Sequence, residues 1–330
     1  MKKVIAGKAL IIIAAVFSSV LATAQQLPIY SQYLYNKFLI NPAVAGSDGY
    51  TSVNLTAREQ WVGYYGAPRT FSFSVQSRML KKSYILKESR FRKEIFRPSS
   101  DGKVGFGGYV FSDKNGLVQK TGFQFSYAYH TWLRNSTQLS FGLALTGYHY
   151  KINEQAIDFE DPNEPWMNNN LRRGMFVPDA TFGVYILNAK YSFGFSADQL
   201  FEASARIANN AYDNFKVDRH YYIFGSWDFV PAYKTIIQPS FLLRTSELIM
   251  PQADFGSTYI YDNSFWAGLS YRTSGALIAT LGVKHEKMFF GYAFDFTLQQ
   301  IQRVTYGTHE ITLAFKFGDS MRRYRWLDRY

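Results

Sequence analysis

The chain has 330 residues, a formal net charge of +11 and no cysteine, and aromatic residues make up 18% of it. The lack of cysteine excludes a disulfide framework, a thiolate nucleophile and a lipid-anchored cysteine. A basic surface suits nucleic acid or anionic lipid, but no nucleic-acid-binding motif is present.

The first 24 residues have the features of a secretory signal peptide. Lys2, Lys3 and Lys8 precede an apolar stretch from Ala9 to Leu21, and the small residues Ala22-Thr23-Ala24 end it. We predict cleavage after Ala24, and because the three lysines carry +3 of the +11, +8 remains on the mature chain. The alternative is a single membrane anchor, for which the apolar run is short.

Residues 25–49 form a lead-in segment without strand-like alternation. Tyr30, Tyr33, Leu34, Lys37 and Phe38 recur at helical spacing, and the following Asn-Pro pair would end such a helix. We expect either a plug that enters the periplasmic mouth of the downstream domain or a linker along its rim.

From residue 50 almost to the end of the chain, apolar and small or polar residues alternate. In one segment Leu139, Phe141, Leu143 and Leu145 alternate with Gln138, Ser140, Gly142, Ala144 and Thr146. Such alternation places one set on each face of a sheet. Segments of about ten residues suit tilted membrane strands, and aromatic residues near their ends resemble interfacial girdles. With the signal peptide, this favours a membrane barrel over a soluble β-sandwich.

We therefore predict an all-β fold, a closed antiparallel transmembrane β-barrel of about 14 strands in the outer membrane. It spans residues 50–317, follows a short N-terminal helical or plug segment, and precedes a basic periplasmic tail at 318–330. The expected strands are 50–59, 69–79, 103–112, 119–132, 136–147, 177–187, 189–198, 217–229, 234–245, 249–259, 263–272, 275–285, 287–297 and 308–317. Two features fit poorly: a long link at 80–102 where a short periplasmic turn is expected, and Pro239 within a strand.

No catalytic or metal-binding constellation stands out. The five histidines lack metal-ligand spacing, and no local motif joins a nucleophile to a base, so we predict no enzyme, metal or cofactor. Seven charged residues fall on the polar face of the strands: Arg58, Asp198, Arg244, Lys284, Asp295, Glu310 and Lys316. If paired they would fill the barrel interior, and if unpaired they would line a conducting pore.

Two basic stretches are expected to face the periplasm. They include Lys81, Lys82, Lys87, Arg90, Arg92 and Lys93 in the long link, and Arg322, Arg323 and Arg325 in the tail. They form either solvated surfaces or a docking patch for an acidic periplasmic partner.

Two local motifs carry a family resemblance. Ser31-Gln32-Tyr33 with Ile40-Asn41-Pro42-Ala43, and Gln60-Trp61-Val62-Gly63 with Gly66-Ala67-Pro68-Arg69-Thr70, resemble the opening of the PorP/SprF family of the type IX secretion system. The motif positions are Asn41, Pro42, Gly46, Arg58, Gln60, Trp61, Gly63, Gly66, Ala67 and Pro68. Physically, the first three are expected to shape the turn into the first strand. The loop residues shape the first extracellular loop, with Trp61 at the membrane interface.

The resemblance implies a non-enzymatic barrel that supports secretion or cell-surface anchoring of large adhesins with a C-terminal sorting domain, and gliding motility. Expected partners are the adhesin, other secretion components, periplasmic lipoproteins and outer-membrane lipid. Trp166, Met167, Phe176 and Phe201, in the loops 148–176 and 199–214, are the expected apolar anchors. The alternatives are an outer-membrane channel or hydrophobic-solute transporter and, as a third class, a membrane hydrolase.

Overall fold

The computed structural model describes residues 29–79, 103–133, 137–152, 175–201, 204–206, 214–216, 218–247 and 251–318. The predicted signal peptide, the basic link after Met79 and the tail after Gly318 lie outside these ranges. Within them the helical elements are three 3-10 turns, η1 (Lys37–Leu39), η2 (Pro42–Val44) and η6 (Gln300–Val304). None of the helices in this part of the chain has the length and apolarity that a membrane crossing requires.

The rest of the described chain is dominated by β-strands. They are β1 (Thr51–Glu59), β2 (Arg69–Met79), β3 (Val104–Asn115), β4 (Val118–Trp132), β5 (Gln138–Ile152), β6 (Met175–Leu187), β7 (Tyr191–Asp198), β8 (Ser204–Arg206), β9 (Asn214–Lys216), β10 (His220–Trp227), β11 (Phe229–Ala232), β12 (Thr235–Ser246), β13 (Gln252–Tyr261), β14 (Phe265–Arg272), β15 (Ala276–His285), β16 (Met288–Thr297) and β17 (Thr308–Phe317).

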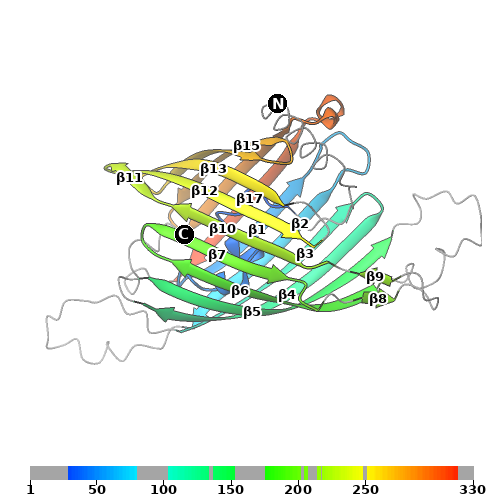
Figure 1. Ribbon diagram of the computed structural model, residues 1–330. Coiled ribbons are helices and arrows are strands. Elements are labelled where there is room, and N and C mark those ends of the chain that lie inside the picture. The colour runs from blue at the N-terminus through cyan, green and yellow to red at the C-terminus, as the bar shows by residue number, and fades with distance from the viewer. Residues whose placement is uncertain are drawn as a thin grey trace, which may run out of the picture.

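Fifteen of these strands form one antiparallel sheet that closes on itself (Figure 1). Neighbours in the chain pair in order, β7 pairs with β10, β10 with β12, and β17 pairs back with β1. Because β11 continues β10 after a one-residue interruption, the barrel wall has fourteen strands, as predicted. Closure leaves the barrel without a free edge, so backbone N–H and C=O groups are paired where lipid offers no partner.

The alternation sorts side chains as expected. In β5, Phe141, Leu143 and Leu145 are exposed on the outer face, whereas Ser140 and Ala144 are buried toward the lumen. On the outer face Tyr191 stacks on Trp227 with ring centroids 5.1 Å apart, an aromatic contact of the kind found in interfacial girdles.

Among the departures from the expected strands, two stand out. β5 continues to Ile152, because Tyr148 and Lys120 turn inward and the Lys120 ammonium lies 4.0 Å from the Tyr148 ring centroid. Large side chains therefore point inward at this end of the strand, opposite to the pattern in the rest of it. The hydropathy pattern alone does not indicate where the strand ends. The β8–β9 hairpin was not predicted.

Pro239 does lie within a strand, β12. The register between β10 and β12 ends at Ser226 and Ser240, so Pro239 falls beside the interruption between β10 and β11. A proline lacks the N–H of a ladder hydrogen bond, and this interruption is where a strand tolerates that loss.

The two barrel ends differ in their connections. The segments after β4, β6, β11, β13 and β15 are short, and we call their end the turn end. The opposite end, which holds the links after β1, β5, β7 and β16, is the loop end. In outer-membrane barrels the short turns face the periplasm.

Candidate functional site: the plugged lumen and its loop-end rim

The segment 30–50, which we call the plug, lies inside the barrel (Figure 1, dark blue). Phe38 and Ala43 are fully buried, and Asn41 is 1% exposed. The predicted helix is wrong: the plug has the 3-10 turns η1 and η2 instead. Of the two alternatives expected for this segment, a plug and a linker along the rim, the structure has the plug.

The plug crosses the lumen and does not stop at the periplasmic mouth. Its upstream part, at Ser31, hydrogen-bonds Arg58 and Glu310, which lie at the loop end of β1 and β17. Its downstream part, at Gly46, donates its backbone N–H to Gln76 Oε1 near the turn end of β2, at 3.2 Å. The chain then enters β1 from the turn end.

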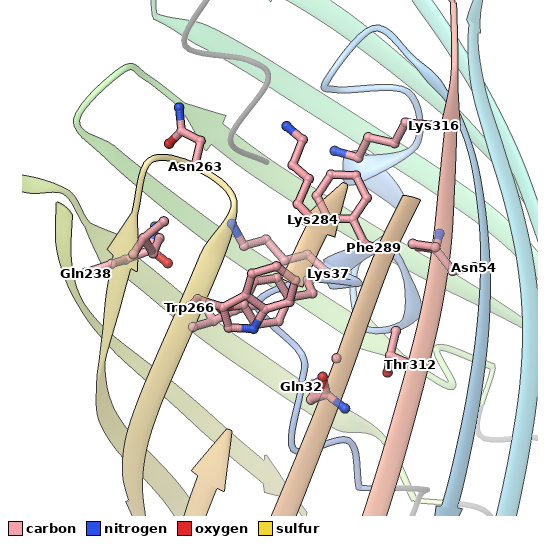
Figure 2. Close-up of a pocket in the computed structure, with 15 residues that line it drawn as sticks. Gln32, Lys37, Asn54, Gln238, Asn263, Trp266, Lys284, Phe289, Thr312 and Lys316 are labelled. Carbon is pink, nitrogen blue, oxygen red and sulfur yellow. The ribbon is translucent and has the colours of Figure 1, made fainter. Parts of the chain in front are cut away.

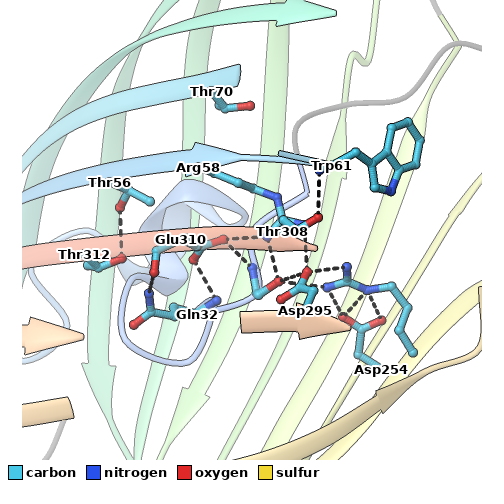
Figure 3. Close-up of polar contacts among 12 residues, drawn as sticks. Gln32, Thr56, Arg58, Trp61, Thr70, Asp254, Asp295, Thr308, Glu310 and Thr312 are labelled. Atoms are coloured by element: carbon cyan, nitrogen blue, oxygen red, sulfur yellow. Dashed lines mark hydrogen bonds and ion pairs between the residues drawn. The ribbon is translucent and has the colours of Figure 1, made fainter. Parts of the chain in front are cut away.

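An ionic cluster holds the upstream end of the plug (Figure 3). The Arg58 guanidinium lies 2.8 Å from an Asp295 carboxylate oxygen and 3.0 Å from a Glu310 oxygen. The same Glu310 carboxylate accepts the backbone N–H groups of Ser31 at 2.8 Å and Gln32 at 2.9 Å. The Ser31 hydroxyl donates to Asp295 at 2.7 Å. Three strands and the plug thus meet through charge-assisted bonds, the stronger class of hydrogen bond.

The cluster extends across the lumen through two more arginines. Arg272 lies 3.3 Å from Asp295 and 3.0 Å from Asp254, and Arg244 lies 2.7 Å from Asp254. Of the charges that the sequence placed on the polar face, Arg58, Arg244, Asp295 and Glu310 are therefore paired inside this cluster. Lys316 pairs with Asp48 of the plug at 3.0 Å. Pairing matters because a buried charge without a partner is costly.

The downstream half of the plug is held by close packing against lumen-facing glycines. A β-carbon on Gly105 of β3 would lie 2.0 Å from the Ala45 carbonyl oxygen. A β-carbon on Gly107, two residues further along β3, would lie 2.5 Å from the Phe38 ring. These positions have no space for a side chain while the plug is in place.

Glycines on β5 and β6 complete this contact. A β-carbon on Gly142 would lie 2.2 Å from the backbone nitrogen of Ala43, and one on Gly183 would lie 2.1 Å from Asn41 Oδ1. The Asn41 amide donates to the carbonyl oxygens of Val184 and Phe195, each at 3.0 Å, and its Oδ1 accepts the Ala43 N–H at 2.9 Å. Asn41 therefore caps η2 and anchors it to β6 and β7, which extends its expected role in shaping a turn.

The turn end fixes the last residues of the plug. Gly46 has φ +67°, and a β-carbon there would lie 2.8 Å from the Ser77 carbonyl oxygen, so both conformation and space favour glycine. The Ala45 carbonyl oxygen lies 2.9 Å from His130 Nε2. Arg78 of β2, just before the predicted basic stretch, is buried and donates to Gln138 Oε1 at 2.9 Å. Pro42 lies within η2 as its first residue.

A cavity of about 50 Å³ lies between the plug and the β12–β17 side of the lumen (Figure 2). Tyr35 of the plug stacks on Trp266 with ring centroids 4.6 Å apart. The ammonium groups of Lys284 and Lys316 each lie 5.1 Å from the centroid of the Phe289 ring. The cavity is thus small, and plug side chains form one of its walls.

The loop 60–68 at the loop end is tied to its neighbours on both sides. The Trp61 N–H donates to Thr308 Oγ1 at 3.2 Å, and the Val62 N–H donates to the Gly307 carbonyl at 2.8 Å. On the other side the Gly116 N–H donates to the Gly66 carbonyl at 3.2 Å. The motif residues of this loop therefore build a hydrogen-bonded rim.

Within this rim, conformation explains several motif positions. Trp61 adopts φ +54°, an uncommon value for a non-glycine residue, while Gly63 and Gly66 have φ +94° and +72°. The Gln60 N–H donates to the Pro68 carbonyl at 2.9 Å and closes the loop, and the Ala67 N–H donates to the Tyr64 carbonyl at 3.2 Å. Trp61 is partly buried at the rim.

Sequence reasoning missed three exposed tyrosines that this rim presents. Tyr65 is 91% exposed, Tyr306 77% and Tyr64 50%. The signal for two of them was visible in the sequence, because Tyr64 and Tyr65 stand between the two glycines of the second motif.

Of the predicted partner anchors, the structure places Phe176 and Phe201. Phe176 faces outward and stacks on Phe123 with centroids 6.2 Å apart, and Phe201 is exposed at the loop end. Trp166 and Met167 lie outside the described residues, as do Lys81, Lys82, Lys87, Arg90, Arg92, Lys93, Arg322, Arg323 and Arg325. Across the described ranges, no group of three or more His, Cys, Asp or Glu residues is arranged to hold a metal ion.

Comparison with known proteins places the whole barrel in context. A family model described as type IX secretion system membrane protein PorP/SprF matches residues 22–315. No curated protein matches. Among solved structures the chain is similar to the KdgM porin, at 9% identity and a TM-score of 0.37, covering 81% of this chain and 99% of that one. It is also similar to Omp33 of Acinetobacter baumannii, at 6% identity and a TM-score of 0.42, covering 82% and 100%.

Proposed function

Since the family model covers nearly all of it, this chain belongs to the PorP/SprF family of type IX secretion system membrane proteins, and we propose that it acts without catalysis as a partner-binding outer-membrane barrel. Its partner is the C-terminal sorting domain of a large secreted adhesin. In this proposal the barrel holds that domain at the cell surface and so supports secretion, anchoring and gliding motility.

The observation that carries the proposal is the plug. Residues 30–50 fill the lumen and are anchored at both ends, by the Arg58 cluster and by the glycine-lined wall. A barrel with a filled lumen offers its rim and loops to other molecules, whereas a channel needs an open interior. Five of the seven charges predicted on the polar face, Arg58, Arg244, Asp295, Glu310 and Lys316, form ion pairs within the lumen or with the plug, which weighs against the alternative of a conducting pore.

The test is recovery of the partner from native outer membranes. The full chain carrying an affinity tag is purified in mild detergent, and an unrelated tagged porin from the same membranes serves as the control. We expect enrichment of a large secreted protein with a C-terminal sorting domain. If no such protein and no other secretion component is enriched over the porin control, the proposal is wrong.

A second measurement separates surface anchoring from mere co-purification. A soluble reporter is fused to the recovered sorting domain, and its display on intact cells is compared with and without this barrel. We expect display to be lost when the barrel is deleted and to return when it is restored. Unchanged display in the deletion strain contradicts the proposed role.

A further inference from the structure

Three neighbouring segments at the loop end form one continuous surface, which we call the rim platform: residues 60–68, 115–118 and 298–307. Val62 exchanges backbone hydrogen bonds of 2.8 Å with Tyr306 and Gly307 on one side. Gly66 accepts the Gly116 N–H on the other. A β-carbon on Gly63 would lie 2.9 Å from the Tyr306 ring, so that ring rests on the glycine. The platform is held in place by its own backbone.

The platform exposes aromatic side chains on this fixed backbone. Tyr65, Tyr306 and Tyr64 are at least half exposed, and Val304 and Leu117 are exposed beside them. Tyrosine is enriched among residues that dominate protein–protein affinity, because it offers a large contact area and loses little conformational freedom. Trp61 keeps a left-handed conformation there, and such local strain clusters at binding sites.

Among the described residues around these tyrosines, the charge is positive. The three platform segments contain Arg303 and no Asp or Glu. Lys114 and Arg69 are exposed on the strand ends that border them. Of the acidic residues on these strand ends, Glu59 pairs with Arg69 at 3.0 Å, and Asp113 is buried and accepts a hydrogen bond from Thr70. Arg303 and Lys114 therefore add positive charge that no acidic residue of the platform balances. A positive patch selects a negatively charged counterpart and speeds its association.

From these features we infer that the rim platform is the docking surface for a folded protein domain with an acidic face, in which Tyr65 and Tyr306 are the anchor residues. This inference rests on the proposed function, because it names the place where the secreted partner binds. It differs from the expectation that the loops around Phe176 and Phe201 supply the contact.

The experiment measures binding of one defined probe, the purified C-terminal sorting domain of the adhesin recovered with the barrel. The full-length barrel is held in lipid nanodiscs, and affinity is measured by biolayer interferometry. Tyr65→Ala and Tyr306→Ala should each weaken binding roughly tenfold or more, as hot-spot truncations do. Arg303→Glu should slow association and reduce its dependence on salt.

The matched control is Tyr233→Ala. Tyr233 is 88% exposed, close to the 91% of Tyr65, but it lies in the turn between β11 and β12 at the opposite end of the barrel. We expect this variant to bind like the wild type. A Phe201→Ala variant tests the competing loop, and heat-modifiable gel migration verifies that every variant is folded.

The outcomes separate this inference from the proposed function. If the wild type binds and both tyrosine variants stay within twofold of it, the platform is not the docking site while the proposed function stands. If the wild type does not bind the domain at all, both fall. If the variants instead abolish self-association of the barrel and leave domain binding unchanged, the platform is a contact between copies and the inference is overturned.

Discussion

The two halves of the plug are held in different ways. Upstream, Ser31 and Gln32 are fixed by charge, through the carboxylates of Glu310 and Asp295 and the guanidinium of Arg58. Downstream, η2 is fixed by shape, since Gly105, Gly142 and their neighbours leave no volume between wall and plug. Charge-assisted hydrogen bonds are strong and directional, but each needs its charged partner in place. Close packing is disrupted when a substitution makes one of the packed side chains larger. The difference indicates which substitution damages which half.

The largest effect is expected at the charged end. Arg58→Met should lower the free energy of unfolding by about 3–5 kcal/mol, because it leaves Asp295 and Glu310 buried with fewer compensating charges. The measurement is urea unfolding in lipid vesicles, followed by tryptophan fluorescence. If Arg58→Met unfolds like the wild type, the cluster does not hold the structure together.

The next effect is expected at the packed end. Gly105→Ala should destabilise by about 1–3 kcal/mol, because the added methyl group overlaps the Ala45 carbonyl. Gly108→Ala on the same strand is the control, since its β-carbon would lie 3.3 Å from the Gln124 carbonyl oxygen, a contact that a shift of a few tenths of an ångström relieves. Equal effects at the two glycines would show that strand propensity, and not the plug, decides the result.

Asn41 lies in the packed half of the plug but acts through hydrogen bonds, so its variants separate hydrogen bonding from packing. Asn41→Ala should cost about 1–2 kcal/mol through lost capping and lost bonds to Val184 and Phe195. Asn41→Asp keeps an oxygen for the cap but loses the amide donors. We expect the aspartate variant to be no more stable than the alanine variant. Wild-type stability for Asn41→Asp would mean that the cap alone matters.

The smallest effect is expected for a charge pair outside the plug. Arg69 and Glu59 lie 3.0 Å apart, with side chains 61% and 45% exposed. Arg69→Met should change the free energy of unfolding by less than about 1 kcal/mol, in the same urea assay. An effect as large as that of Arg58→Met would show that burial does not distinguish the two ion pairs.

Much of the barrel could be predicted from the sequence. The strict alternation of residues such as Phe141, Leu143 and Leu145 identified the lipid-facing set, and the strand boundaries of β2 and β17 agree with the structure. Alternation is a local property, so it is readable one strand at a time. Four charges of the lumen cluster, Arg58, Arg244, Asp295 and Glu310, were also identified from their place on the polar face, whereas Arg272 and Asp254 of the same cluster were not.

The contacts of the plug could not be predicted in the same way. Helical spacing in residues 30–38 indicated a helix, yet the segment is shaped by a wall that its own sequence does not contain. Gly105, Gly142 and Gly183 look like ordinary small residues of the polar face. Only the folded barrel shows that they face Ala45, Ala43 and Asn41, respectively. The two sequence motifs meet in space at the bond between Ser31 and Arg58, which spacing along the chain does not reveal.

The central claim is that residues 30–50 close the barrel. Single-channel recording of the purified full-length protein in planar bilayers tests it most directly, because a plugged lumen does not pass ions. We predict that the wild type inserts without a steady open conductance. A stable, porin-like open state of the wild-type protein would contradict the account and favour the channel alternative.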